Sequence, residues 1–207
     1  MFEVEAYYFD FDDTLTNRHV EDFGTRNPSD KECAGLMKQG AIDTLRQIMK
    51  RGHHVAIITN GTKDRIPIVL KGAGLRDEEI AKIDIHAAGN PKIIVCGYKP
   101  NAIKELAFGK WNDTKNHYFY DDRDIFYDEA KALIPDFNLT GKNLVVEQVN
   151  PRDYSFLDKI RERITGMKRP ISEGNEFTKF NSADNDTTPL VTKTEENDCC
   201  ISVCALL

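Results

Sequence analysis

Two carboxylates, Asp10 and Asp12, stand two residues apart near the start of this 207-residue sequence, directly after a short apolar run. The run predicts a strand over residues 4–10, and side chains two apart on an extended segment point to the same side. Asp10 and Asp12 would therefore face one ligand, with Phe11 turned away. Two carboxylates with different neighbours can divide the roles of nucleophile and general acid/base. The alternative is an acidic turn without a ligand, because Asp is common where a strand gives way to a turn.

Polar residues also end two more predicted strands. Thr59 closes the apolar run of residues 54–59, and Asp121 follows the run of residues 117–120. A short, continuously apolar run is typical of a strand buried on both faces. In open parallel sheets, ligands bind outside the carboxyl ends of the strands. The sequence therefore predicts one site at one edge of a sheet, built from Asp10, Thr59 and Asp121.

The elements that must position these residues alternate between strand and helix. Apolar residues recur at helical spacing between the apolar runs, and Gly52 closes the first of the helices. This alternation predicts an α/β fold with a doubly wound parallel sheet. The expected strands cover residues 4–10, 54–59, 83–87, 117–120 and 144–146, and the expected helices cover residues 41–49, 64–73, 102–108, 125–133 and 154–164. Residues 16–38 are expected to be polar and irregular, and residues 92–96 to form one arm of a short hairpin.

Four short motifs resemble, in the same order, those of the haloacid dehalogenase (HAD) superfamily of phosphatases. The segment DFDDTLT, residues 10–16, resembles the first motif, Asp-x-Asp-x-Thr after a buried strand. The other three motifs are a strand-end Thr or Ser, a Lys at the start of a helix and an acidic pair after a strand. They are matched by Thr59 in VAIITNGT, Lys99 in GYKPNAIKEL, and Asp121-Asp122 in HYFYDDRD. The sequence departs from the family pattern at Asp13, where many members have Gly, and in lacking the frequent Gly-Asp opening of the fourth motif.

The resemblance implies a phosphatase mechanism. Asp10 would attack phosphorus and form an aspartyl-phosphate, while Asp12 would protonate the leaving oxygen and then activate water. The Thr59 hydroxyl and the backbone amides around Asn60 would donate to the phosphoryl oxygens, and Lys99 would neutralise the developing charge. The structural alternatives are a helix cap for Thr59 and a solvated surface side chain for Lys99.

The resemblance also implies Mg²⁺, a hard cation that prefers oxygen ligands. Its ligands would be the carboxylates of Asp10 and Asp121 and the backbone carbonyl of Asp12. Asp121 is favoured because it is the first polar residue beyond its strand, but Asp122 stays open as the ligand or as a second one. Lesser candidates are Asp124 and Asp128.

Two insertions determine how open the site would be. In the superfamily, substrate choice is mostly set by a cap inserted after the first motif or after the third strand. Here these insertions are residues 17–38 and 88–98, which are too short for an independent core. An open site admits a phosphate group on a macromolecule, so the expected substrate is a phosphoprotein carrying phosphotyrosine or phosphoserine/threonine. The alternatives are a small phosphorylated metabolite, phosphoryl transfer to an acceptor other than water, and a catalytically silent binding module.

A change in composition divides the chain into a HAD-like phosphatase domain, residues 1–165, and a polar linker and lipidation tail, residues 166–207. The tail lacks an apolar period before Ile201, so it is expected to be disordered. It ends in Cys204-Ala205-Leu206-Leu207, which matches a C-a-a-X prenylation signal. One lipid gives only marginal membrane binding, and palmitoyl groups on Cys199 and Cys200 would supply the second signal. The alternative is a chance cysteine in a disordered tail.

These features predict a lipid-anchored protein on the cytoplasmic face of eukaryotic membranes, and otherwise a cytosolic one. Because prenylation is eukaryotic, the chain is expected to be eukaryotic or to be delivered into a host cell by another organism. No apolar run approaches the roughly 20 residues that span a bilayer. The net charge of −6 argues against nucleic acid as a partner, because a phosphate backbone is bound by a concentrated basic surface.

Overall fold

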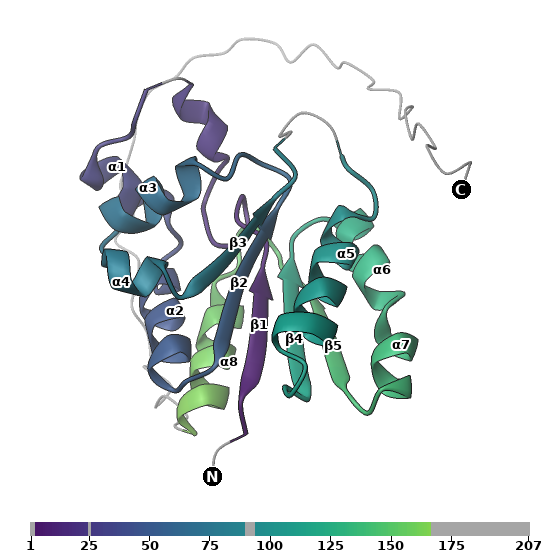
Figure 1. Cartoon of the computed structure of the whole chain (residues 1–207). Helices are drawn as coiled ribbons and strands as arrows, with labels where there is room; N and C mark the ends of the chain where they lie inside the picture. The colour runs from purple at the N-terminus through teal and green to yellow at the C-terminus, as the bar shows by residue number, and fades with distance from the viewer. Residues whose placement is uncertain (1–2, 25, 90–93, 167–207) are drawn as a thin grey trace. The chain divides into compact units, whose positions relative to one another are not determined.

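A central strand, β1 (Glu5–Phe9), pairs with strands on both of its sides. The structure is a computed structural model that describes residues 3–24, 26–89 and 94–166. Its sheet has five parallel strands. Their order is β3-β2-β1-β4-β5 (Figure 1). The other strands are β2 (His54–Thr59), β3 (Ile83–Ala87), β4 (Asn116–Asp121) and β5 (Asn143–Gln148). The strand order reverses beside β1, as in doubly wound sheets, so the predicted α/β class is confirmed.

Alternate residues of β1 point to opposite faces of the sheet, and helices cover both faces (Figure 1). Tyr7 and Phe9 enter one core, and Ala6 and Tyr8 enter the other. The first core is completed by helices α2 (Ala41–Lys50), α3 (Arg65–Gly72) and α8 (Ser155–Thr165). The second is completed by α5 (Tyr98–Glu105), the π-helical turn η2 (Leu106–Lys110), α6 (Asp124–Lys131) and α7 (Ile134–Leu139). Burial on both faces explains why the central strands read as continuous apolar runs.

The insertion after β1 contains two short elements, which corrects the expectation of an irregular stretch. The 3₁₀ turn η1 (Val20–Phe23) is followed by helix α1 (Asp30–Leu36). Helix α1 begins with a capping box, in which Ser29 Oγ accepts from the Glu32 N–H and the Glu32 carboxylate accepts from the Ser29 N–H. Apolar residues of both elements enter the first core: Val20, Phe23, Cys33 and Leu36. The described part of the insertion therefore packs on the sheet domain and has no core of its own.

Three further helices also differ from the expected ranges. Helix α5 begins at Tyr98, earlier than the expected residue 102, because Gly97 takes the left-handed conformation (φ 75°) before it and Pro100 fits its first turn. Two short helices were not expected: α4 (Asp77–Ile80), which precedes β3, and α7, which follows α6. Within the described ranges, no helix combines the length and the apolar character needed to cross a membrane.

Two predicted features fall partly or wholly outside the described ranges. Residues 94–97 form no strand, and residues 90–93 of the expected hairpin are not described. Residues 167–207, which carry the predicted linker and lipidation sites, are also outside. The lipidation sites concerned are Cys199, Cys200 and Cys204.

Candidate active site

The register of the sheet brings Asp10 and Asp121 side by side. Phe9, the last residue of β1, pairs with Tyr120 of β4 and with Ile57 of β2. Asp10 and Asp121 are the next residues along the chain, and the Asp10 N–H donates to the Tyr120 carbonyl at 2.9 Å. Asp10 is 5% exposed and Asp121 is 0% exposed. The carboxyl edge of the sheet thus holds two adjacent buried carboxylates.

A buried lysine joins these two carboxylates. Lys99 lies in the first turn of α5, and its Nζ is 2.6 Å from Asp10 Oδ1 and 2.6 Å from Asp121 Oδ2. The ammonium also lies over the ring of Phe126, 4.1 Å from the ring centroid. Burial alone would lower the pKa of Lys99, but the two carboxylates outweigh it and raise the pKa. Lys99 therefore places a fixed positive charge next to Asp10.

Asp12 occupies a different environment from Asp10. Its side chain is 13% exposed, and its Oδ1 accepts from the Val20 N–H at 2.8 Å. Burial, together with the negative charge of Asp10, raises the pKa of Asp12 to about 7. A carboxyl group with this pKa can hold a proton at neutral pH and release it again, as an acid/base catalyst must.

A tight turn after Asp12 returns the chain toward β4. Asp13 adopts the left-handed conformation, with φ 59°, which costs a residue with a Cβ on the order of 1 kcal/mol. Glycine would adopt this conformation without that cost. The next residue, Thr14, is buried, and its hydroxyl donates to Asp122 Oδ1 at 3.2 Å. The turn is thereby tied to the end of β4.

Three carboxylates meet at this edge and could hold a metal ion. Oxygen atoms of Asp10, Asp121 and Asp122 lie within 4.8 Å of one another. Burial and the charge of Asp10 raise the pKa of Asp121 to about 7 and that of Asp122 to about 6. The cluster sets three carboxyl groups beside one buried ammonium, that of Lys99, and its donors are the hard oxygen atoms that Mg²⁺ prefers. Asp121 already accepts from Lys99 and from the Arg123 N–H, the latter at 3.0 Å.

The loop after β2 forms the opposite wall of the site. Thr59 is buried, and its Oγ1 accepts from the Gly61 N–H at 3.1 Å, which leaves the hydroxyl hydrogen to donate to a ligand. A Cβ on Gly61 would lie 3.3 Å from Asp12 Oδ2. The loop can therefore approach the carboxylates this closely because residue 61 has no side chain.

These residues line one narrow cleft with a volume of about 30 Å³. Most of the residues predicted from the sequence lie in its wall: Asp10, Asp12, Thr59, Asn60, Lys99 and Asp122. Asp121 does not line the cleft, since it lies against Lys99. Other residues of the wall had no role assigned from the sequence: His19, Gly61, Arg123 and Phe126. Of these, Arg123 could have been suggested by its place directly after the fourth motif.

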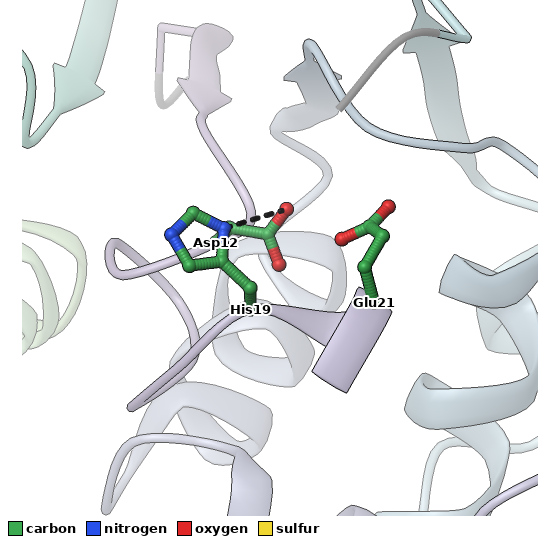
Figure 2. A group of neighbouring side chains, drawn as sticks. All are labelled: Asp12, His19 and Glu21. Carbon is green, nitrogen blue, oxygen red and sulfur yellow. Dashed lines mark ion pairs between the residues drawn. The ribbon is translucent and has the colours of Figure 1, made fainter. Parts of the chain in front are cut away.

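The insertion after β1 contributes His19 and Glu21, which Figure 2 shows beside Asp12. His19 Nδ1 lies 3.9 Å from Asp12 Oδ2, and His19 Nε2 lies 3.2 Å from Asp13 Oδ2. Glu21 Oε1 accepts from the N–H and the hydroxyl of Thr62, at 3.4 and 3.2 Å. No sequence motif contains His19 or Glu21, so only the folded chain reveals them. The insertion thus closes the side of the cleft next to Asp12.

No protein-family model matches the chain, and no curated protein matches it by sequence. Among solved structures, the effector Ceg4 from Legionella pneumophila has a TM-score of 0.61, at 18% identity, over 78% of this chain and 95% of its own. The HAD domain of the effector protein Lem4 from Legionella pneumophila has a TM-score of 0.54, at 16% identity, over 78% of this chain and 94% of its own. At such identities the likeness is one of fold. The chain therefore has a HAD-like fold, and the residues of its four predicted motifs meet at the carboxyl edge of the sheet.

Proposed function

We propose that this protein is a Mg²⁺-dependent phosphomonoesterase that works through an aspartyl-phosphate on Asp10. The observation that carries the proposal is that Asp10, Asp12 and Lys99 line one cleft, with Thr59 in the same wall. A nucleophile, an acid/base group, a fixed positive charge and a hydroxyl donor are the parts that phosphoryl transfer through a carboxylate needs. The HAD-like fold supports the same reaction class.

In the first step, Asp10 attacks phosphorus. Its Oδ1 is held by Lys99 at 2.6 Å, so the second carboxylate oxygen forms the new bond to phosphorus as the ester bond breaks. The Thr59 hydroxyl donates to a phosphoryl oxygen, and Lys99 offsets the negative charge of the group in transfer. The product of this step is an acyl phosphate on Asp10.

Asp12 moves the protons. In the first step its carboxyl group protonates the departing ester oxygen, and in the second step its carboxylate takes a proton from the water that attacks the acyl phosphate. The pKa of Asp12, raised to about 7, suits both roles near neutral pH. The second step releases inorganic phosphate and regenerates both carboxylic groups.

The carboxylates of Asp10 and Asp122 would hold the Mg²⁺, with the backbone carbonyl of Asp12. The ion would supply the positive charge that lets a carboxylate approach a phosphate dianion against their repulsion. We assign the cleft-facing ligand to Asp122 rather than to Asp121, which the sequence favoured. The reason is position, because Asp122 lines the cleft, whereas Asp121 does not line it and lies against Lys99.

The proposed substrate is a phosphoprotein, carrying phosphotyrosine or phosphoserine/threonine. The cleft is small, and the insertion beside it is a short flap without a core of its own, so only the phosphorylated side chain needs to enter. A small phosphorylated metabolite would find few groups to bind its remaining atoms. A phosphopeptide should therefore be hydrolysed with a higher kcat/KM than a sugar phosphate. Transfer to an acceptor other than water is disfavoured because the flap does not enclose the site.

The proposed place of action is the cytoplasm of a eukaryotic cell, at membranes. This rests on the Cys204-Ala205-Leu206-Leu207 signal, with Cys199 and Cys200 as further acylation sites, and holds for a chain that ends at Leu207. Two solved structures of similar fold are effectors of Legionella pneumophila, which supports action inside a host cell.

Turnover of para-nitrophenyl phosphate, with Mg²⁺ and after its removal by a chelator, tests the reaction class. The parent should release phosphate only with the metal, and Asp10→Asn should abolish release because the amide is a poor nucleophile. Asp136→Asn, on the exposed surface of α7, is the matched control and should keep the parent rate. Circular dichroism checks that both variants are folded. A folded Asp10→Asn protein that turns over near the parent rate rules out Asp10 as nucleophile.

A further inference from the structure

A second buried lysine lies behind the cleft and has no part in the mechanism above. Lys38 is 1% exposed, as is Lys99, but among the described residues no carboxylate forms an ion pair with it as Asp10 and Asp121 do with Lys99. Its Nζ instead donates to the backbone carbonyl of Asp13 at 2.6 Å. Burying an ammonium group is costly unless its donors are satisfied, so this contact needs an explanation.

The carbonyl that Lys38 binds belongs to the strained residue of the active-site turn. Among the described residues, Asp13 is the only non-glycine residue with a positive φ, 59°. It connects Asp12, the proposed acid/base, to Thr14, whose hydroxyl donates to Asp122. A small change in the Asp13 backbone would therefore move the carboxylates on both sides of the cleft.

Lys38 is itself held on two sides. Its backbone N–H donates to the Leu15 carbonyl at 2.9 Å, next to an isolated antiparallel bridge between Thr16 and Met37. Its ammonium lies 5.6 Å from the ring centroid of Phe156, at the start of α8. These contacts place the ammonium between the helix and the turn. A side chain fixed at both ends can hold the turn in a way that a mobile surface lysine cannot.

The charge of Lys38 supports the same arrangement. Burial lowers the pKa of Lys38, while the carboxylates of Asp122, Asp13, Asp153 and Asp10 oppose that shift. The ammonium thus lies in the field of the acidic cluster, and its strong N–H donor points at the Asp13 carbonyl.

We propose that Lys38 is a positioning residue that holds the left-handed turn at Asp13 and thereby sets the placement of Asp12 and of the Thr14–Asp122 contact. Glycine adopts this conformation without strain, so a turn with glycine would need no such support. The left-handed conformation of Asp13 and the hydrogen bond from Lys38 are therefore energetically coupled. The inference rests on the proposed function for its catalytic consequence, but the coupling itself is a property of the fold.

A double-mutant cycle of Lys38→Met and Asp13→Gly tests the proposal. Lys38→Met keeps an unbranched apolar stem of nearly the same length but removes the terminal ammonium, and with it the donor and the charge. In the Asp13 background it should lower kcat by about 100-fold, because small displacements of catalytic groups cost rates of this size. In the Asp13→Gly background the same substitution should cost about tenfold or less. KM should change much less than kcat in both, because the phosphate-binding residues Thr59 and Lys99 are untouched.

Lys142→Met is the matched control. Lys142 is also buried, at 8% exposed, and donates to backbone carbonyls, with Nζ 2.8 Å from Thr114 O at the opposite edge of the sheet. Its loss should lower stability without changing the kcat of the folded protein. An equal loss of kcat from Lys38→Met in both backgrounds would overturn the proposal, because a turn with glycine would then need Lys38 as much as the strained turn does. An Asp13→Asn background removes the carboxylate but keeps the Cβ, so there Lys38→Met should still cost far more than in the Asp13→Gly background.

The same double-mutant cycle can be measured without an activity assay, from the urea concentration at the midpoint of unfolding of each protein. Lys38→Met should lower the midpoint more in the Asp13 background than in the Asp13→Gly background, and equal shifts would contradict the coupling. If Lys38→Met folds in neither background, Lys38→Gln replaces it, and equal midpoint shifts in the two backgrounds would again contradict the coupling. A parent protein without phosphatase activity would refute the proposed function, while the midpoints would still decide on the turn.

Discussion

Asp10 and Asp12 carry the same functional group, yet their surroundings make them chemically different. Asp10 faces the ammonium of Lys99 at 2.6 Å, whereas Asp12 accepts a hydrogen bond from the Val20 N–H at 2.8 Å. Burial and the neighbouring charge of Asp10 raise the pKa of Asp12 to about 7. Two carboxyl groups with distinct environments can thus divide nucleophilic and acid/base work.

This division of roles predicts that the loss of rate caused by Asp12→Asn depends on the leaving group of the substrate. Without the acid, an alkyl phosphate with a poor leaving group should be hydrolysed about 10²–10⁴-fold more slowly. An activated aryl phosphate should lose much less in the first step, because its leaving oxygen needs little protonation. Single-turnover rates for the two substrates provide the measurement. Equal losses for both would show that Asp12 is not the acid.

At the scale of elements, the loop after β2 depends on close approach to the insertion after β1. A Cβ on Gly61 would lie 3.1 Å from Glu21 Oε1 and 3.3 Å from Asp12 Oδ2, tighter than ordinary contacts. Gly61→Ala should therefore displace Asp12 or Glu21 and lower kcat by roughly tenfold, less than a full ångström of misplacement would. Gly109→Ala is the control, since its added Cβ meets no atom within 4 Å. Parent activity in Gly61→Ala would show that the loop has more freedom than this packing indicates.

His117 links β4 to its neighbours and predicts how stability depends on pH. Its Nε2 lies 3.0 Å from the Thr114 carbonyl, so Nε2 carries the hydrogen and donates. Its Nδ1 then accepts from the Tyr8 hydroxyl at 2.8 Å, which is the pattern of a neutral ring. Burial lowers the pKa of His117 to about 4.

Since an unfolded His titrates near 6.5, the unfolded chain binds the proton more readily between these values. Stability should therefore fall as pH falls from about 6.5 to about 4, by up to about 3 kcal/mol from this residue. His117→Gln, which does not titrate, should show a flatter dependence of the urea midpoint on pH than the parent. Carboxylates titrate in both proteins, so the difference between the two profiles isolates His117. Parallel profiles would contradict the expected shift.

At the scale of the whole molecule, the proposed anchor and the catalytic domain should act independently. For the 207-residue chain with a free carboxyl group at Leu207, Cys204→Ser should release the protein from membranes to the cytosol of eukaryotic cells. The same variant should keep the parent activity on para-nitrophenyl phosphate, because the described cleft is built entirely from residues 10–126. Fractionation and an activity assay on one preparation test both parts. A variant that stays on membranes would refute the anchor.

Much of the fold was predictable because its signals are local. The buried strands appear as apolar runs, and four of the expected helices correspond to α2, α3, α6 and α8. Helix α1 was missed because its stability comes from a capping box and from two core contacts, Cys33 and Leu36, within a polar segment. The start of α5 was missed because Gly97 and Pro100 read as breakers, although both suit a helix start.

The sequence by itself determined the α/β class and the residues most suited to chemistry, Asp10, Asp12, Thr59 and Lys99. These signals can be read from the sequence because side-chain periodicity and strand-end position depend on neighbouring residues in the chain. Only the tertiary structure decided that Asp121 pairs with Lys99 while Asp122 faces the cleft, and that Lys38 donates to the backbone carbonyl of Asp13. Such choices depend on strand register and on contacts between segments far apart in the sequence, because burial and distance exist only after the chain has folded.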